Sequence, residues 1–258
     1  MKHDYVYRGL QASTWDLSRG DTSTWTDRLF YLDVVHRYGE PVLDIGCGTG
    51  RILLDFLAQG IDIDGVDDSP EMLGICHEKA KQAGLRDTSR QQKMEALDLG
   101  RRYRTILIPS SSFQLLTDAT TAQAAMRCCY AHLCQGGALV SAFGFGWRQG
   151  DPLDTGWELK FEKQRSEDGA VVTAWERTWH EPELQLWHEE ERFEVKLDGR
   201  VIQTQTLRRS PSGRWYSQEQ AIKLLKDTGF SEVQMFSGFS RSPATADDRL
   251  ICAVAIKG

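Results

Sequence analysis

The sequence predicts an α/β fold in which a mostly parallel, doubly wound sheet carries an inserted antiparallel sheet. Three observations support this prediction. An apolar strand at 42–45 runs through three alternating glycines directly into an amphipathic helix at 51–57. Apolar strand segments and helical segments then alternate up to about residue 143, as they do when crossover helices join parallel strands. Between residues 147 and 215 the pattern changes to long stretches of period two, which is typical of antiparallel strands.

Length and charge limit the class of protein. The 258 residues suffice for one α/β domain with an elaboration, and the net charge is -6 with acidic and basic residues mixed along the chain. Nucleic acid is an unfavourable partner, because neutralising phosphates needs clustered Lys and Arg. No apolar run approaches the roughly 20 residues of a membrane span, and the N-terminus lacks the apolar region of a signal peptide. We therefore expect a soluble, cytoplasmic monomer or homodimer with neither nucleic acid nor membrane as partner.

The cysteines suggest neither disulfides nor a metal. Six cysteines scattered over the chain do not form the framework of a disulfide-rich protein. Cys128, Cys129 and Cys134 lie near His132 on an expected helix, but their spacing matches no common zinc pattern. Because free cysteine behaves as a small buried hydrophobe, we expect no metal site.

The glycine turn is the first candidate binding element. Gly46, Gly48 and Gly50 alternate along it, so its backbone can adopt positive φ and lie directly against a ligand. The helix that follows directs its first N–H groups to the same place. A dinucleotide fingerprint would have its third glycine at position 51, where this chain has Arg51. We therefore expect a small-molecule site that is not a nicotinamide site.

The stretch 44–50, Asp-Ile-Gly-Cys-Gly-Thr-Gly, resembles the first motif of class I S-adenosylmethionine-dependent methyltransferases. The resemblance implies a Rossmann-like seven-stranded sheet, S-adenosyl-L-methionine as cofactor and S-adenosyl-L-homocysteine as product. In that family the acidic residue and the glycine loop hold the methionine end of the cofactor. This assigns Asp44, Gly46, Cys47 and Gly48 to the cofactor site.

The second strand, 61–66, ends in Asp67, about 20 residues beyond the glycine turn, where a carboxylate can accept hydrogen bonds from a ribose diol. The stretch 65–73 is similar to the second motif of the family, in which this acid binds the ribose. Asp68 then lies beside the adenine, or it serves as a favourable acid at the start of the next helix. Met72 on that helix is also assigned to the cofactor site.

The third strand, 88–92, leads to the expected adenine contacts. In relatives an acid at this junction accepts from the adenine amino group, but this chain has Lys93 there. Two arrangements remain open: Glu95 replaces that acid, or backbone groups and Met94 hold the ring alone. Both Met94 and Glu95 are therefore assigned to the cofactor site.

The fourth strand, 105–108, ends in Pro-Ser-Ser-Ser-Phe at the expected switch point of the sheet, where ligands bind beyond the strand ends. Pro109 and Ser110 are assigned to the cofactor and Ser111 is a candidate catalytic residue. The N-methyltransferases that act on nucleic-acid bases or glutamine amides often have Asn/Asp-Pro-Pro-Tyr/Phe here. The different sequence in this chain favours a small-molecule acceptor.

After a helix at 120–133 and a fifth strand at 138–143, residues 146–210 are expected to form the antiparallel insert. Its strands have one apolar face, with Trp157, Leu159 and Phe161 expected on the same side. Neighbouring residues of a strand point to opposite faces, so the run His188–Glu191 is expected to be solvated and not to bind a metal. The insert covers the substrate or forms a homodimer contact.

The core domain is expected to comprise residues 1–145 and 211–258. A capping-box sequence at 217–220 begins the last helix, and two strands, the final one antiparallel, complete the sheet.

Five residues are candidates for catalytic roles. Tyr7 and Trp15 belong to an N-terminal segment that is either a lid, with aromatic faces near the sulfonium, or a packed cap. Ser111 lies at the switch point. His180 and Tyr216 are possible acid/base groups, although a surface role is favoured for both.

The expected function is methyl transfer from S-adenosylmethionine to a small polar metabolite, at an amine nitrogen. The insert after the fifth strand is similar to that of sugar-amine and related small-molecule N-methyltransferases. Two alternatives remain open: an O-methyltransferase of a small natural product, and a non-catalytic S-adenosylmethionine-binding protein. Lys93 and the lack of an obvious base motivate the last.

Overall fold

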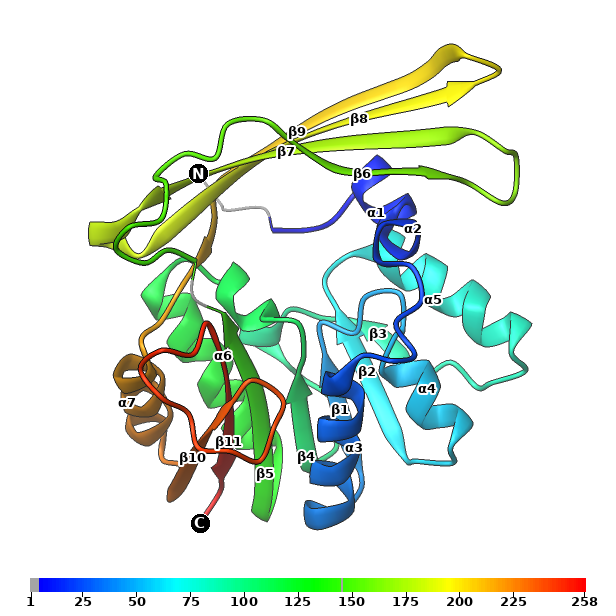
Figure 1. The fold of residues 1–258 in the computed structure, drawn as a ribbon. Helices are drawn as coiled ribbons and strands as arrows, with labels where there is room; N and C mark the ends of the chain where they lie inside the picture. Colours follow the sequence, from blue (N-terminus) through cyan, green and yellow to red (C-terminus); the bar gives the residue numbers. More distant parts are fainter. Residues whose placement is uncertain (1–4, 145) are drawn as a thin grey trace.

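A computed structural model describes residues 5–144 and 146–258 of the chain. Its core is a seven-stranded sheet of order β10-β11-β5-β4-β1-β2-β3, parallel except at β11, which is antiparallel to both neighbours. This confirms the predicted Rossmann-like, mostly parallel sheet (Figure 1). The strands are β1 Val42–Ile45, β2 Ile63–Asp67, β3 Ser89–Gln91, β4 Tyr103–Ile108, β5 Leu133–Gly144, β10 Glu232–Ser237 and β11 Leu250–Ile256.

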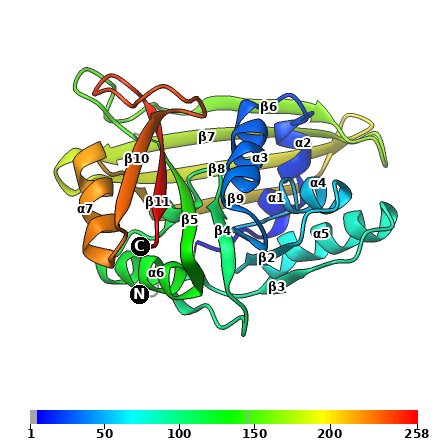
Figure 2. The ribbon, with the colours of Figure 1, turned by 90° about the horizontal axis from the view of Figure 1, so that it is seen from below.

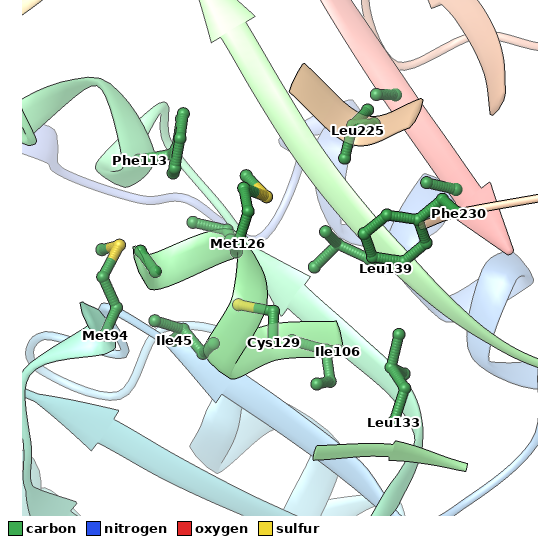
Figure 3. Packing of buried hydrophobic residues seen from close by; sticks show 14 of the residues in the cluster. Ile45, Met94, Ile106, Phe113, Met126, Cys129, Leu133, Leu139, Leu225 and Phe230 are labelled. Atoms are coloured by element: carbon green, nitrogen blue, oxygen red, sulfur yellow. The ribbon is translucent and has the colours of Figure 1, made fainter. Parts of the chain in front are cut away.

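Helices cover both faces of the sheet because its strands alternate their side chains between two cores. Val42 of β1 belongs to a buried cluster with residues of α3 (Thr26–Tyr38), α4 (Leu53–Ala58) and α5 (Pro70–Gln82). Leu43 and Ile45 belong to a second cluster with residues of α6 (Ala119–His132) and α7 (Gln218–Thr228). Figure 3 shows Met126 and Cys129 of α6 beside core-strand residues of this second cluster.

Four long strands form the inserted sheet, of order β6-β7-β8-β9 and antiparallel throughout, as the pattern of period two predicts. Their bounds are β6 Glu158–Gln164, β7 Val171–Glu181, β8 Leu186–Leu197 and β9 Arg200–Arg214, with the short 3-10 helix η3 Pro182–Leu184 between β7 and β8. Figures 1 and 2 show this sheet lying across the core sheet, at the carboxyl ends of β1 and β4. Strand β9 continues past residue 210 to Arg214.

A β-bulge changes the expected side-chain pattern of β6. The pairing with β7 shifts register between Leu159 and Phe161, so Lys160 is the extra residue. As a result Phe161 is buried at 8% exposure, whereas Leu159 is 61% and Trp157 is 48% exposed. The prediction that these three side chains share one apolar face is therefore wrong, because a bulge reverses the alternation.

The N-terminal segment connects the two sheets through α1 (Gly9–Ser13) and α2 (Trp15–Arg19). Leu10, 2% exposed, packs into a third hydrophobic cluster with Phe161 and Phe193 of the inserted sheet. On the other side, the Gly9 N–H donates to Glu71 Oε2 of α5 at 2.6 Å. Residues 5–19 thus bridge the core and the insert, and Figure 1 shows α1 and α2 beneath β6.

None of the helices in the described part of the chain is long and apolar enough to cross a membrane.

Candidate functional site

A cavity of about 560 Å³ opens where the core sheet, the inserted sheet and the N-terminal segment meet. This volume is typical of small-molecule sites. The floor is formed by the glycine turn and the ends of β2 and β4, and the 3-10 helix η2, Ser112–Leu115, closes one corner. The ceiling is formed by side chains of β6, β8 and β9, and aromatic side chains of the N-terminal segment line the side.

The glycine turn requires glycine for conformation and for space. Gly46, Gly48 and Gly50 have φ of +73°, +56° and +86°, a region that L side chains rarely adopt. A Cβ on Gly46 would lie 2.8 Å from Ser112 Oγ, and one on Gly50 would lie 2.7 Å from Cys76 Sγ. The turn therefore keeps its backbone exposed to the cavity while packing closely on its other side.

Asp44, at the end of β1, contributes a buried carboxylate to the floor. The residue is 1% exposed, and its Oδ1 has no hydrogen-bond partner among the described residues. Burial raises the pKa of Asp44 to about 7, with the nearby charge of Arg51 opposing this shift. A buried carboxylate oxygen without a partner beside an open cavity fits a ligand that carries an ammonium group, as the amino-acid end of S-adenosylmethionine does.

Asp67, at the end of β2, is held by the glycine turn itself. Its Oδ2 accepts from the Gly48 N–H at 2.9 Å, and its Oδ1 accepts from the Ser69 N–H at 2.8 Å. Each carboxylate oxygen can accept more than one hydrogen bond, so capacity remains for the hydroxyls of a ribose. Burial raises the pKa of Asp67, and the two backbone donors oppose the shift.

The adenine end of the expected site lies beyond Asp67. Asp68, Met72 and Met94 line the cavity there, and Lys93 lies 3.5 Å from Asp68 Oδ2. Glu95 is not part of the lining. Its carboxylate accepts from Tyr5 Oη at 3.1 Å, so it holds a side chain of the N-terminal segment in place of facing the cavity.

Several expected residues meet in this one cavity although they lie far apart in the sequence. The catalytic candidates Tyr7 and Trp15 contact each other edge to face, with ring centroids 4.9 Å apart. Ser110 and Ser111 have φ of +54° and +58°, an uncommon conformation outside glycine. The expected residues that line the cavity are Tyr7, Trp15, Asp44, Gly46, Cys47, Gly48, Asp67, Asp68, Met72, Met94, Pro109, Ser110 and Ser111.

Two catalytic candidates lie outside the lining. His180 of β7 contacts the edge of Trp215, with ring centroids 6.1 Å apart, and burial lowers its pKa. Tyr216 packs against Phe113 and Phe143, and burial raises its pKa to about 12. Both side chains therefore pack against aromatic neighbours, and neither lines the cavity.

The ceiling contains charged residues that the sequence analysis expected in solvent. Glu191 Oε1 accepts from Lys160 Nζ at 2.8 Å, and its Oε2 accepts from Gln11. Glu189 Oε2 accepts from Arg209 at 2.7 Å and from Ser212 at 2.6 Å.

The expectation of a solvated run at 188–191 is therefore wrong. His188 and Glu191 are buried, at 5% and 3% exposure. The pleat does separate neighbours: Glu189 and Glu191 line the cavity, whereas His188 stacks on Trp179 with ring centroids 5.0 Å apart. The available signal was the shared face of positions 187, 189 and 191, but the sequence alone does not say what covers that face.

Arginine and tryptophan side chains line the cavity beside the glycine turn. Arg51 forms a two-point ion pair with Asp27, with nitrogen to oxygen distances of 3.0 and 2.5 Å. The guanidinium carbon of Arg51 lies 5.0 Å from the centre of the Trp25 ring. Arg19 lies over Trp15 at 4.0 Å and over Trp25 at 5.3 Å. Arg19 and Trp25 also line the cavity, but they belong to no recognisable motif, so the sequence does not identify them as site residues.

In the described ranges, no three His, Cys, Asp or Glu side chains gather as metal ligands.

A family model described as a methyltransferase domain matches residues 42–137. Among curated proteins, the ubiquinone biosynthesis O-methyltransferase of Psychrobacter cryohalolentis is 28% identical over 102 residues. That match spans 40% of this chain and 40% of the relative.

Solved structures match over nearly the whole chain. An S-adenosylmethionine-dependent methyltransferase from Clostridium acetobutylicum has a TM-score of 0.77 at 20% identity, covering 95% of this chain and 96% of its own. The sugar N-methyltransferase KedS8 from Streptoalloteichus sp. has a TM-score of 0.74 at 20% identity, covering 100% and 96%. CalS10, an amino pentose methyltransferase from Micromonospora echinaspora solved with S-adenosylmethionine bound, has a TM-score of 0.69 at 20% identity, covering 99% and 100%.

Proposed function

We propose that this chain, which matches a methyltransferase domain model over residues 42–137, transfers a methyl group from S-adenosylmethionine to an amine nitrogen of a small polar metabolite. One observation carries the proposal. The cavity floor combines three features: a buried carboxylate oxygen of Asp44 that has no hydrogen-bond partner in the described part of the chain, a glycine turn, and Asp67 at the end of the next strand. These three groups follow one another in the same order as the ammonium group, the rest of the methionine part and the ribose of the cofactor.

The floor residues divide the cofactor between them. Asp44 would pair with the ammonium group, the backbone of Gly46 and Gly48 would lie along the methionine part, and Asp67 would accept from the ribose hydroxyls. Met72 and Met94 would contact the adenine. When bound, S-adenosylmethionine supplies a methyl group on a positively charged sulfur. The chain's own contribution is alignment of the acceptor and exclusion of water.

The ceiling favours an amine acceptor. A neutral amine attacks without a strong base, whereas a hydroxyl needs one or a tight orientation. The carboxylates that the ceiling offers are engaged by donors of the protein, Glu189 by Arg209 and Ser212, and Glu191 by Lys160. The names of CalS10 and KedS8, an amino pentose and a sugar N-methyltransferase, agree with an amine.

Methylation of a hydroxyl group is the second candidate. It is supported by the O-methyltransferase named among the curated relatives, although that match spans only two fifths of each chain.

We also propose that residues 146–210 form a roof over the acceptor, while residues 1–145 and 211–258 form the cofactor-binding core. Lys160, Glu191 and Arg209 of the inserted sheet face the cavity, which supports the roof over a role confined to a dimer contact.

Calorimetry with S-adenosylhomocysteine tests the cofactor, and transfer of a labelled methyl group tests the reaction. The acceptor panel consists of matched pairs, each an amine and the alcohol that differs from it only at that group. We expect binding of S-adenosylhomocysteine and transfer to amine members alone. Failure to bind rejects the proposal. Transfer to the alcohols alone supports the second candidate, and binding without transfer to any member supports a non-catalytic cofactor-binding protein.

A further inference from the structure

The cations of the cavity differ in how they are neutralised. Arg51 is paired with Asp27, Lys160 with Glu191 and Arg209 with Glu189. Arg19 also lines the cavity, but within the described residues its guanidinium makes neither an ion pair nor a hydrogen bond. It is enclosed by the rings of Trp15 and Trp25, at 4.0 and 5.3 Å.

A half-buried cation without an anion is unfavourable unless a ligand supplies the anion. Burial lowers the pKa of Arg19, and the positive charge of Arg51 acts in the same direction. The two flanking indole rings offset part of this cost through cation–π attraction. None of the five N–H donors of the guanidinium is used by another described residue, and their planar geometry suits a carboxylate.

The position of Arg19 points to the methionine end of the cavity. Asp16, one turn earlier on α2, accepts from Thr49 Oγ1 of the glycine turn at 2.6 Å. Residues three apart on a helix share a face, so Arg19 lies on the side of α2 that faces this turn. Arg19 and Arg51 also lie over the same ring, that of Trp25, at 5.3 and 5.0 Å, and both line the cavity together with Asp44.

We infer that Arg19 binds the carboxylate of the methionine part of S-adenosylmethionine, opposite Asp44, which binds the ammonium group on the same carbon. This inference rests on the proposed function, and it adds a link between the cofactor and the N-terminal segment. Because Arg19 belongs to α2, a bound cofactor carboxylate holds that helix against the glycine turn. The segment therefore closes over the cofactor through a charge that the cofactor itself supplies.

Calorimetry with two nucleosides tests this assignment. S-Adenosylhomocysteine carries the amino-acid part, whereas 5′-methylthioadenosine has the same adenosine and thioether without it. In Arg19→Gln we expect S-adenosylhomocysteine to bind about 10- to 100-fold more weakly, as expected for loss of a charge-assisted hydrogen bond. The affinity for 5′-methylthioadenosine should change by less than about twofold, because this nucleoside lacks the carboxylate. Arg19→Lys keeps the charge and should recover part of the lost affinity.

Arg165→Gln serves as the control, since Arg165 pairs with Asp168 on a surface hairpin outside the cavity. Equal weakening of both nucleosides in Arg19→Gln would mean that Arg19 only packs the segment, and would overturn the inference. Unchanged binding of S-adenosylhomocysteine would overturn it as well. The anion that pairs with Arg19 would then have to come from the acceptor. If Arg19→Gln does not fold, the same comparison is made with Arg19→Lys. Wild-type protein that binds neither nucleoside contradicts the proposed function itself.

Discussion

Asp44 is a residue whose ionisation lowers the stability of the fold. Its carboxylate is buried, one oxygen has no hydrogen-bond partner in residues 5–144 and 146–258, and burial raises its pKa to about 7. In the unfolded chain the same group ionises near pH 4. Between these two values the folded state keeps a proton that the unfolded state has released, so ionisation of Asp44 makes folding less favourable as pH rises.

The variant Asp44→Asn should remove this dependence, because an amide does not ionise. Between pH 5 and pH 8 we expect its free energy of unfolding to rise relative to wild type by about 2 to 3 kcal/mol, because one pKa unit corresponds to 1.36 kcal/mol. Its affinity for S-adenosylhomocysteine at pH 8 should fall at least tenfold, since the ammonium loses its counter-charge. Urea unfolding at both pH values and calorimetry measure the two effects. A variant with the wild-type pH dependence would show that Asp44 is already ionised well below pH 7.

The strained serines at the end of β4 illustrate a second residue-scale feature. Ser110 and Ser111 both have positive φ, and Ser110 Oγ lies 3.4 Å from the Arg51 guanidinium. Residues held in such conformations are common at functional sites, where the surrounding structure over-determines them. The serines therefore mark the corner at which cofactor and acceptor would meet.

At the scale of elements, α5 connects the floor of the cavity with the N-terminal segment. Ser69 caps the helix by accepting from the Met72 N–H at 3.1 Å, and Pro70 occupies its first turn. Met72 faces the cavity, and Glu71 accepts from Gly9 of α1. The helix therefore contacts both the floor of the cavity and the N-terminal segment that lines its side.

Two glycines near this helix allow a matched test of backbone conformation. Gly74 lies inside α5 and Gly84 follows its end with φ of +67°, and a Cβ would meet no atom within 4 Å at either position. Gly74→Ala should raise the free energy of unfolding by about 0.5 to 1 kcal/mol, because alanine loses less entropy in a helix. Gly84→Ala should lower it by about 1 kcal/mol, because a side chain is strained at this φ. Thermal or urea unfolding distinguishes them, and equal effects would contradict the assigned backbone.

The bulge in β6 changes which side chains the inserted sheet directs into the cavity. By placing Lys160 out of register, it lets this lysine reach Glu176 and Glu191, both at 2.8 Å, while Phe161 fills the cluster beneath. Bulges commonly redirect a side chain next to a functional site.

For the whole molecule, the hydrophobic clusters suggest two parts that meet at the cavity. Two clusters fill the faces of the core sheet, and the third joins Leu10 and Leu17 of the N-terminal segment to the inserted sheet. The cavity lies between these parts, so its width depends on how the segment and the insert pack. We therefore expect the insert and the segment to open together.

Truncation of Leu10 tests this coupling. Leu10→Ala should destabilise the third cluster by about 2 to 4 kcal/mol, in the range for buried leucines. Amide hydrogen exchange should quicken in β7 and β8 while staying unchanged in β4 and β5, and S-adenosylhomocysteine should bind more weakly. Leu29→Ala, at a side chain that is 60% exposed, is the control. Uniformly faster exchange over both sheets would show that the molecule unfolds as a single unit.

The fold of the core sheet could be predicted from the sequence, because the motifs that indicate it each lie within a short segment. The turn 44–50 needs three glycines within a few residues, and the strands and helices of a parallel sheet alternate in one repeating order. Asp67 follows from that order, because the carboxyl ends of neighbouring parallel strands meet at one edge.

The upper half of the cavity was decided by tertiary structure. The residue pairs that build it are remote in sequence: Gln11 with Glu191, Leu10 with Gln205, and Arg19 with the glycine turn through α2. Alternation along β8 separates Glu189 from His188, yet it does not say which face meets a cavity. No pattern predicts the bulge at Lys160, and none predicts that the Arg19 guanidinium has no carboxylate partner among the residues that the structure describes. Such outcomes depend on packing between distant segments, whereas the floor depends on conformational preferences that each short segment carries by itself.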